Sequence, residues 1–521
     1  MPKKLSRRDF MKLSGLFTAT SITLACGLFM DDEPDAAYPT ETEKKPVESP
    51  QQAEVTGEAE AHHQVIVVGG GIAGLTTAYF LQDEDVDVMV LESAANPGGR
   101  AQTGTYKGVH FARGTEYLGE PYGALRKIIK ATGLKKVMVP DPMDAHFHDG
   151  KFYWSDDGLA LMHIQDTNLR TFNRFVKDVM KMEDEYVEAP DFDPKAAIAA
   201  LDEMIAREWF EQNSYGGTLE EAYNVAARGL FGANLDEISA LSYIPEIAFD
   251  YEDAETIEDV EDLDNFPKRM GYDTGSYTFE TGIAEVNIAL ADVLGSSLLL
   301  NATVRSVTRT GDIYLVQYQD TAGKEHSLSA DVVVLAVPAP LALEIAPTVL
   351  DNERRDLMSQ IPYSQYLTLA LFSDTPIFNQ AFDLAVPDDW FFTDIYDSTW
   401  VERTFNSSLP KDVWVAGVYI APKSYKDTSL HSMDEQDVFE RVMNDLEKVL
   451  PGARAKVTGY ELTRFPYAYP VMVTGAYKRL VRLNKLNRGS LLLAGDYMIY
   501  PTFEAACDSG ELAADQVLKE L

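Results

Sequence analysis

The stretch that decides the fold is QVIVVGGGIAGLTTAYFL, residues Gln64–Leu81. Its apolar run at Val65–Val68 is typical of a short strand that is buried on both faces. The run leads directly into a glycine-rich turn and then into a helical pattern. A strand, a tight turn and a helix in this order predict the first unit of a doubly wound α/β sheet.

The turn carries the spacing G-x-G-x-x-G at Gly69, Gly71 and Gly74. Gly69 permits the tight turn, Gly71 lets backbone N–H groups approach a pyrophosphate, and Gly74 lets the helix pack closely on the strand. Ile72 and Ala73, between Gly71 and Gly74, are counted among the cofactor-binding residues, and the positive end of the helix that follows would face the phosphate charge. The motif therefore predicts a Rossmann-type dinucleotide site, and the alternative is a glycine-rich turn that binds nothing.

An acidic residue supports the dinucleotide interpretation. A second strand pattern, VDVMVLE, ends at Glu92, roughly 20 residues after Gly74. A carboxylate at this place suits the ribose hydroxyls of an adenosine. The glycine motif between two strand patterns, with Glu92 in place, is much more specific than the motif alone.

The residues after Glu92 indicate which dinucleotide is bound. Gly99-Arg100, within PGGR, resembles the flavin amine oxidase superfamily, which includes amine oxidases, protoporphyrinogen oxidases and phytoene desaturases. The resemblance implies FAD as cofactor and places Arg100 by its pyrophosphate, where a guanidinium offers a fixed fork of donors. It also implies that the backbone at Gly114 and Thr115 passes close to the flavin ring.

Two later segments carry the same resemblance. The strand pattern LLLNATVRSV, Leu298–Val307, is similar to the family strand whose backbone pairs with adenine, which implies this role for Val304. Gly495 and Asp496 resemble the family's AGD, whose acid meets the ribityl or phosphate region.

A helix pattern begins at about Phe503. In the family the start of this helix, here with Ala505, points at the flavin pyrimidine edge, where its positive end would stabilise reduced flavin. Cys507 on this helix is interpreted as a small buried apolar residue rather than as a flavin-reactive thiol.

The remaining blocks are expected to form one substrate domain over the flavin. The first is helix-rich, as in AAIAALDEMIAREWFEQ, and the second mixes strands such as YLTLALF and VWVAGVYI with the helix DVFERVMNDLEKVL. The expected fold class is α/β, with a discontinuous Rossmann-type FAD-binding domain and an α+β substrate-binding domain. The predicted segments are an export signal (1–30), a disordered acidic linker (31–61), FAD-binding parts (62–150, 272–348, 478–521) and substrate parts (151–271, 349–477).

Three weak candidates stand near the expected flavin. Many amine oxidases of the superfamily carry a lysine near flavin N5, in a motif that resembles IPYSQYLTLALF, and here Thr368 occupies its place. Many also flank the flavin with two aromatic rings. Thr502 stands at one of these positions, and Tyr469 or Tyr467 is a candidate for the other. Catalytic side chains are otherwise unassigned, because the flavin itself carries the chemistry.

Three functions stay open at this point. The first is oxidation of a small amine at its C–N bond, with oxygen or a quinone as the final electron acceptor. The second is C–C desaturation or oxidation of an apolar substrate, as in phytoene desaturases and protoporphyrinogen oxidases. The third is FAD binding without net redox work. An exported enzyme favours the first, whereas the absent lysine favours the second.

The N-terminus predicts export. SRRDFMK, Ser6–Lys12, precedes a mildly apolar stretch and resembles a twin-arginine signal, which carries proteins that are already folded, here around FAD. The residues before and at Cys26 resemble a lipoprotein cleavage box, so a membrane tether through Cys26 is one alternative and simple cleavage or an uncleaved anchor is the other. The expected location is the periplasm or the outer face of the membrane.

The composition of the chain limits the kinds of molecule that it is expected to bind. The 521 residues carry a net charge of -38, which argues against nucleic acid and is compatible either with a cationic substrate or with a surface adapted to salt. The two cysteines, Cys26 and Cys507, exclude a disulfide framework in practice. No metal-ligand spacing stands out, and a small-molecule substrate is expected.

Overall fold

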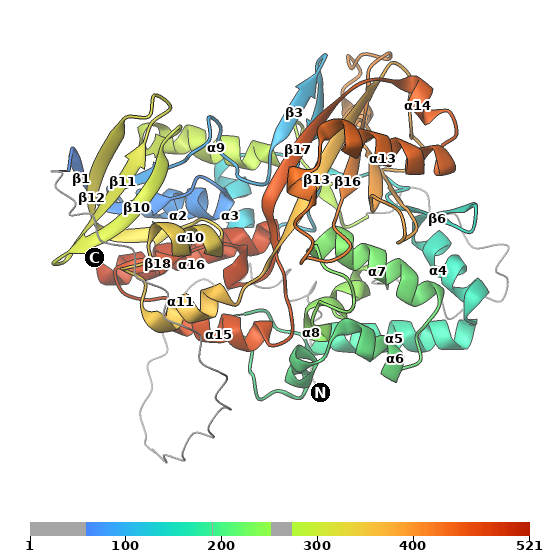
Figure 1. Cartoon of the computed structure of the whole chain (residues 1–521), viewed down its shortest axis with the longest axis horizontal. Coiled ribbons are helices and arrows are strands. Elements are labelled where there is room, and N and C mark those ends of the chain that lie inside the picture. Colours follow the sequence, from blue (N-terminus) through green and yellow to red (C-terminus); the bar gives the residue numbers. More distant parts are fainter. Residues whose placement is uncertain (1–58, 190, 252–273) are drawn as a thin grey trace.

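The computed structural model describes residues 59–189, 191–251 and 274–521. Figure 1 shows two main sheets, one blue and yellow and one mostly orange, with a group of green helices below the second. The first sheet has the order β10 (Thr303–Thr310), β11 (Ile313–Gln319), β12 (Glu325–Leu335), β1 (Ala61–Val68), β2 (Val88–Leu91) and β9 (Leu298–Leu299), with β18 (Leu491–Leu493) paired to β12. The second has the order β17 (Val457–Pro470), β13 (Tyr363–Ser373), β16 (Trp414–Ile420), β15 (Asp394–Asp397), β14 (Asp383–Ala385), β6 (Ala145–His148) and β7 (Lys151–Trp154).

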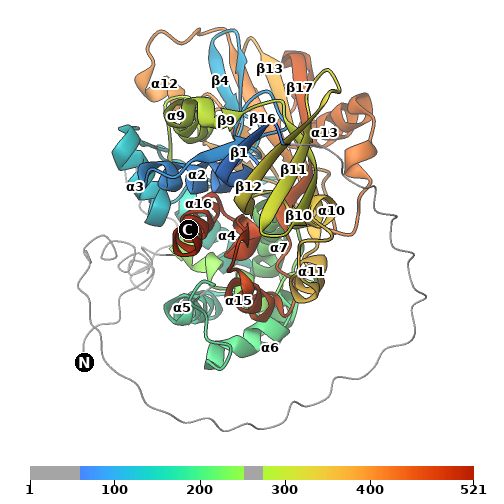
Figure 2. The ribbon, with the colours of Figure 1, turned by 90° about the vertical axis from the view of Figure 1, so that its left-hand side faces the viewer.

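The first sheet is built around β1, as predicted. β1 lies parallel to β12 and to β2, so that Val65 is opposite Val332 on one side and Val88 on the other. Val65 and Val67 pack against a layer of helices, while Ile66 belongs to the core on the opposite face. The helices of this layer are α2 (Ile72–Asp83), α3 (Gly123–Thr132), α9 (Ala284–Leu294) and α16 (Phe503–Glu520). Figure 2 shows α2, α3, α9 and α16 on the same side of the strands. Burial on both faces explains the continuous apolar run of the sequence.

Two predicted elements are interrupted. The strand expected over 298–307 is divided into β9 and β10, because Asn301 adopts a left-handed φ of 59° between them. The helical pattern AAIAALDEMIAREWFEQ gives a 3-10 helix, η2 (Ala197–Glu203), and a separate helix, α6 (Ala206–Gln212). Ala206 donates instead to the Ile238 carbonyl at 2.9 Å, so a tertiary backbone contact replaces the helical one.

The second sheet packs one face on a helix. Leu369 of β13 pairs with Val418 of β16, which pairs with Ile395 of β15, and all three belong to the core that α13 (Glu435–Val449) completes. The predicted strands YLTLALF and VWVAGVYI and the predicted helix DVFERVMNDLEKVL are therefore confirmed.

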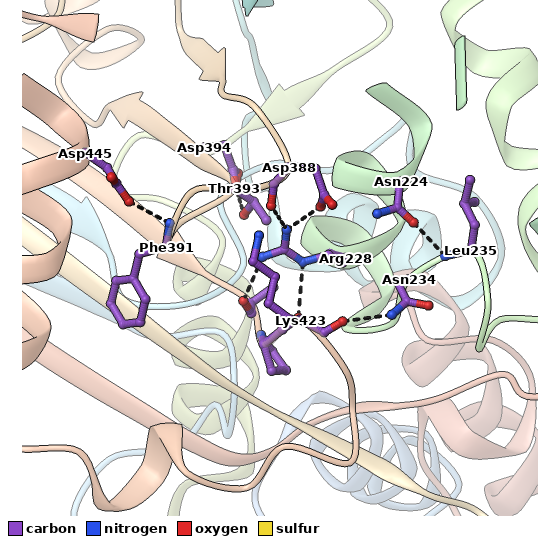
Figure 3. A network of polar contacts seen from close by, with 12 residues as sticks. Asn224, Arg228, Asn234, Leu235, Asp388, Phe391, Thr393, Asp394, Lys423 and Asp445 are labelled. Atoms are coloured by element: carbon purple, nitrogen blue, oxygen red, sulfur yellow. Dashed lines mark hydrogen bonds and ion pairs between the residues drawn. The ribbon is translucent and has the colours of Figure 1, made fainter. Parts of the chain in front are cut away.

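A group of helices docks on this sheet through a buried arginine. Its members are α4 (Ser155–Asp166), α5 (Leu169–Glu185), α6, α7 (Thr218–Phe231) and α8 (Ala240–Tyr243). Arg228 of α7 is 1% exposed and forms an ion pair with Asp388 at 2.5 Å. It also donates to the carbonyls of Ala421 and Pro422, each at 3.2 Å, at the end of β16 (Figure 3). The contact fixes the helices to the edge of the second sheet.

The remaining strands and α-helices of the described residues lie outside these groups. They are the hairpin β3 (Thr103–Tyr106) and β4 (Val109–Ala112), the pair β5 (Val137–Met138) and β8 (Tyr277–Thr278), and the helices α10 (Ala339–Ile345), α11 (Asn352–Ser359), α12 (Glu402–Phe405), α14 (Ala453–Lys456) and α15 (Ala476–Leu486). The predicted boundary at 150 falls inside the β6–β7 hairpin of the second sheet.

The expected export signal, Cys26 and the linker up to residue 58 lie outside the described residues. Within the described ranges no helix is long and apolar enough to cross a membrane.

Candidate active site

The glycines of the predicted motif differ in what surrounds them. A Cβ on Gly69 would lie 2.4 Å from the Ala336 carbonyl oxygen, and one on Gly74 would lie 2.0 Å from the Gly69 carbonyl oxygen. These two glycines therefore serve the packing of the protein itself. A Cβ on Gly71 would meet only the Gly99 Cα, at 4.0 Å. Protein packing alone does not require glycine at position 71. The open space beside Gly71 leaves room for a ligand.

The start of α2, at Ile72 and Ala73, is open to an anion. Gly71 stands at its N-cap, and no side chain of the described residues caps this end. The first N–H groups of a helix lack intrahelical partners and carry the positive end of the helix dipole. Gly98 donates its N–H to the Gly70 carbonyl at 2.8 Å, which holds the Gly98–Arg100 turn over this helix end.

Glu92 lies beside the same turn. Its Oε2 accepts a hydrogen bond from the Gly70 N–H at 2.6 Å, and its Oε1 accepts one from Ala94 at 2.7 Å. Its backbone carbonyl accepts from Ala302 at 2.8 Å. Val304, two residues further on, lies in β10, where Tyr318 of β11 is its partner. The contact with Ala302 brings Glu92 close to the start of β10, which holds Val304, the other residue predicted to meet the adenosine.

Arg100 and Asp496 meet across the chain. Arg100 Nη1 donates to Asp496 Oδ2 at 2.6 Å and to the Ala468 carbonyl at 2.7 Å. The Asp496 side chain is 5% exposed, so its charge is held in a largely buried place. The Asp496 carboxylate raises the pKa of Arg100 against the opposing effect of burial, so the guanidinium stays charged. A fixed cation beside the uncapped helix is suited to a pyrophosphate.

The last helix, α16, borders the same site. The Gly495 N–H donates to Ser509 Oγ of α16 at 2.6 Å, and Thr502 caps this helix by accepting from the Ala505 N–H at 3.2 Å. Thr502 is thus in a structural position, where a side-chain oxygen satisfies a free helix N–H. The Cys507 side chain is completely buried in the helix layer, which confirms its interpretation as a small core residue.

One face of the second sheet is polar and meets this site. Thr368 of β13 is the cross-strand partner of Tyr419 of β16, and Tyr419 is the partner of Asp394 of β15. Tyr396 of β15 is in turn the partner of Asp383 of β14. Directly opposed residues share a face of an antiparallel sheet, and alternate residues of one strand do so too. These five residues form what we call the polar face, opposite the apolar face that packs on α13.

The polar face contacts the segment predicted to lie by the flavin. Thr368 Oγ1 donates to the Arg113 carbonyl at 2.7 Å, and Tyr419 Oη donates to the Gly114 carbonyl at 2.5 Å. A Cβ on Gly114 would lie 1.9 Å from the Arg100 carbonyl oxygen, so this backbone is packed directly on the arginine turn. Thr115 follows in the same segment.

Buried carboxyl groups give the polar face its electrostatic character. Asp394 is only 9% exposed, and burial raises its pKa to about 7. Burial also raises the pKa of Glu116, which lies next to Tyr419, to about 7. Burial and the nearby Asp394 raise the pKa of Asp383 well above its usual range. The carboxyl groups of Asp394 and Glu116 therefore exchange protons close to neutral pH, and an adjacent cation would favour their charged form.

Aromatic rings surround this face. Tyr396 and Tyr419 lie 4.9 Å apart between ring centres, and Tyr469 contacts Tyr366 at 5.8 Å. Tyr469 is therefore beside the polar face. Phe392 belongs to the core on the apolar side. A pocket of about 490 Å³ is also on that side, lined in part by Trp390 and Leu430 of the same core.

Sequence reasoning did not identify Glu116, Asp383 and Asp394 as site residues. Asp394 and Tyr396 alternate with Ile395 in the strand DIYD, and this period of two is the signal for a half-polar strand. That signal is only four residues long. The partner strands that place these acids together come from segments far apart in the sequence, so the cluster depends on the tertiary structure.

The residues present fit FAD. The open space at Gly71, the uncapped helix, the Glu92 carboxylate and the Arg100 guanidinium supply what the pyrophosphate and ribose of a dinucleotide need. The fold and the site thus define a nucleotide-binding α/β oxidoreductase with a second, separate sheet. The chain belongs to the family described as flavin containing amine oxidoreductase, whose model matches residues 72–518, and it is an FAD-dependent oxidoreductase.

Relatives of different activity share this fold. The chain is 24% identical over 495 residues to an L-amino-acid oxidase of Siganus canaliculatus, covering 88% of this chain and 86% of the relative. It is similar in structure to cyclohexylamine oxidase from Brevibacterium oxydans, with a TM-score of 0.65, 19% identity and coverage of 88% and 99% of the two chains. It is equally similar to a putative protoporphyrinogen oxidase from Exiguobacterium, with a TM-score of 0.65, 19% identity and coverage of 89% and 100%.

Proposed function

We propose that this enzyme oxidises a C–N bond of a small amine that binds at the polar face. The observation that carries the proposal is the buried carboxyl group of Asp394, which stands with two tyrosine rings on the face that meets the Arg113–Gly114 backbone. When bound, FAD accepts the hydride that leaves the substrate carbon. The protein's own residues bind the amine, orient it and exclude water.

The carboxyl groups suit a cation better than a hydrocarbon. An ammonium group beside Asp394 would compensate its charge and offer it hydrogen bonds. The rings of Tyr396 and Tyr419 add the attraction of an aromatic face for a cation. An apolar polyene on the same face would leave buried polar groups unpaired, at a cost of a few kcal/mol each.

The second candidate is C–C oxidation of an apolar substrate. The observation that favours it is Thr368, which stands where many amine oxidases have a lysine and has its hydroxyl engaged by the Arg113 carbonyl. The likeness to a putative protoporphyrinogen oxidase agrees with it at the level of the fold. The two candidate functions differ in their substrates. Only amine oxidation needs a charged group on the polar face.

The test is the substitution Asp394→Asn at about pH 8, above the pKa of this group. We expect KM for the best amine to rise at least tenfold, with flavin content and the rate of flavin reduction at saturating amine little changed. Asp397→Asn is the matched control, because Asp397 is on the same strand and its carboxylate already accepts hydrogen bonds from the N–H and the hydroxyl of Thr399. An unchanged KM in Asp394→Asn would show that this face does not bind the amine.

We also propose that the enzyme works outside the cytoplasm. The proposal rests on the twin-arginine pattern at Arg7 and Arg8 and on the lipoprotein-like residues before Cys26. Oxygen or a membrane quinone would then reoxidise the cofactor. Replacing both arginines with lysine should keep the flavoprotein in the cytoplasmic fraction, whereas unchanged export would contradict the signal. Cys26→Ser should release the exported enzyme from membranes if the tether exists.

A further inference from the structure

Two hydroxyl groups hold consecutive carbonyl groups of one backbone segment. Thr368 Oγ1 donates to the Arg113 carbonyl and Tyr419 Oη to the Gly114 carbonyl, at 2.7 and 2.5 Å. Thr368 and Tyr419 are direct cross-strand partners on β13 and β16, so one rigid pair of strands positions both donors. The Thr368 side chain is 4% exposed, so water competes little for its contact.

The segment that they hold is coupled to the cofactor arginine. Gly114 packs so closely on the Arg100 carbonyl that a Cβ would lie 1.9 Å from it. Arg113 donates its backbone N–H to the Gln102 carbonyl at 2.9 Å. A shift of the 113–114 backbone would therefore move the Arg100 turn and its ion pair with Asp496.

The hydrogen atoms available to Tyr419 do not suffice for both of its contacts. Tyr419 Oη lies 2.5 Å from the Gly114 carbonyl oxygen and 3.1 Å from Glu116 Oε2. A tyrosine hydroxyl has one proton to donate, and a carboxylate can only accept. Both contacts become hydrogen bonds only when Glu116 carries a proton and donates it to Tyr419 Oη, which leaves the tyrosine proton for Gly114.

We propose that Thr368 and Tyr419 are positioning residues that clamp the 113–114 backbone and, through it, the FAD-binding Arg100 turn, and that a proton on Glu116 completes the clamp. This role is independent of the substrate and holds for either candidate function. It also explains why threonine is useful at position 368, since a lysine would not offer a short neutral donor to the Arg113 carbonyl.

The surroundings of Glu116 agree with a proton held near neutral pH. The carboxyl groups of Asp383, Asp394 and Asp397, on β14 and β15, lie near it, and the hydroxyl group of Tyr419 is its hydrogen-bond partner. Burial is the largest cause that raises its pKa to about 7, followed in the same direction by Asp394, while the Tyr419 hydroxyl lowers it. No cation is among these neighbours in the described residues.

The clamp is tested on the holoenzyme by the temperature at which flavin is released on heating, with FAD affinity as a second readout. Thr368→Val and Tyr419→Phe each remove one donor and should weaken FAD binding about fivefold or more. Thr368→Ser should restore it. The matched controls are Thr463→Val, the partner of Thr368 on β17, and Tyr366→Phe, whose hydroxyl donates to the Gly229 carbonyl at 3.2 Å. Equal loss in variants and controls would overturn the clamp.

The role of the proton on Glu116 is tested by the substitution Glu116→Gln. A glutamine donates from its amide at every pH, as a protonated Glu116 would. Flavin release from the wild type should shift to lower temperature as pH rises from about 6 to 8, and Glu116→Gln should abolish most of that shift. The same pH dependence in both proteins would overturn the proton's role. If Tyr419→Phe does not fold, Thr368→Val and Glu116→Gln still decide the proposal.

Discussion

Gly71 and Gly74 belong to one motif but serve different purposes. Gly74 is constrained by the protein, because a Cβ would lie 2.0 Å from the Gly69 carbonyl oxygen. Gly71 is constrained by no close protein atom, so its lack of a side chain is useful only to a ligand. The structure therefore separates residues needed for folding from residues needed for FAD, although the sequence motif presents them alike.

Gly71→Val should fold but lose FAD. We expect the flavin absorbance of the purified variant to fall to background, because the side chain would occupy the place of the pyrophosphate. Far-UV circular dichroism should stay close to that of the flavin-free wild type. Gly74→Val is the comparison, and it should lose structure as well as flavin. Normal flavin content in Gly71→Val would contradict the site.

His163→Phe should stabilise the protein, increasingly so at acidic pH. His163 is completely buried between Phe172 and Tyr223, and neither ring nitrogen has a hydrogen-bond partner among the described residues. Burial lowers its pKa to about 3, whereas a histidine in the unfolded chain titrates near ~6.5. Between these values only the unfolded chain binds the proton, so this histidine makes stability fall as pH falls.

The gain from His163→Phe should therefore grow by about 1.4 kcal/mol per pH unit below ~6.5. Denaturant unfolding at about pH 8 and about pH 5 measures it. The value at the higher pH serves as the internal control for the change in packing. An equal gain at both pH values would show that the ring is not buried in its neutral form.

At the scale of elements, the final helix links the two halves of the cofactor site. α16 packs on α2 so closely that a Cβ on Gly510 would lie 2.4 Å from the Ala73 carbonyl oxygen. Ser509 on the same helix accepts from the Gly495 N–H, and Thr502 caps the helix end. The position of α16 therefore fixes both the glycine turn and the Gly495–Asp496 segment.

Thr502→Ala should destabilise the enzyme by about 1 kcal/mol, because it removes a helix cap. Thr502→Ser should be close to the wild type. Thermal unfolding of the holoenzyme measures both, and flavin content shows whether the loss reaches the cofactor. If Thr502→Ala is as stable as the wild type, the cap does not stabilise the helix. The structure would then favour the other interpretation of Thr502, as the residue at a position where many amine oxidases hold an aromatic ring beside the flavin.

Much of the cofactor half could be predicted from the sequence because its signals are local. The strand Val65–Val68, the glycine turn and Glu92 lie within 30 residues of one another, and a buried parallel strand has a clear pattern. The polar face could not be predicted, because it exists only through the pairing of β13, β14, β15 and β16. The contact of Thr368 with Arg113 likewise depends on two segments that meet only in the folded chain.

At the scale of the whole molecule, the net charge of -38 should steer cationic substrates. We expect kcat/KM for an amine cation to fall several-fold when NaCl is raised from ~0.02 to ~0.5 M, because salt screens long-range attraction. The kcat at saturation should change little. A neutral substrate or the oxygen reaction serves as control. No salt dependence would favour the other reading of this charge, a surface adapted to salt.

The most direct test of the central claim is anaerobic mixing of the FAD-loaded enzyme with two panels of compounds. One holds amines and amino acids, and the other holds polyenes and porphyrinogens. The readout is bleaching of the oxidised flavin absorbance. Oxidation of a C–N bond predicts rapid bleaching by at least one amine and none by the second panel. Bleaching only by a polyene or a porphyrinogen would contradict it and assign the enzyme to C–C oxidation.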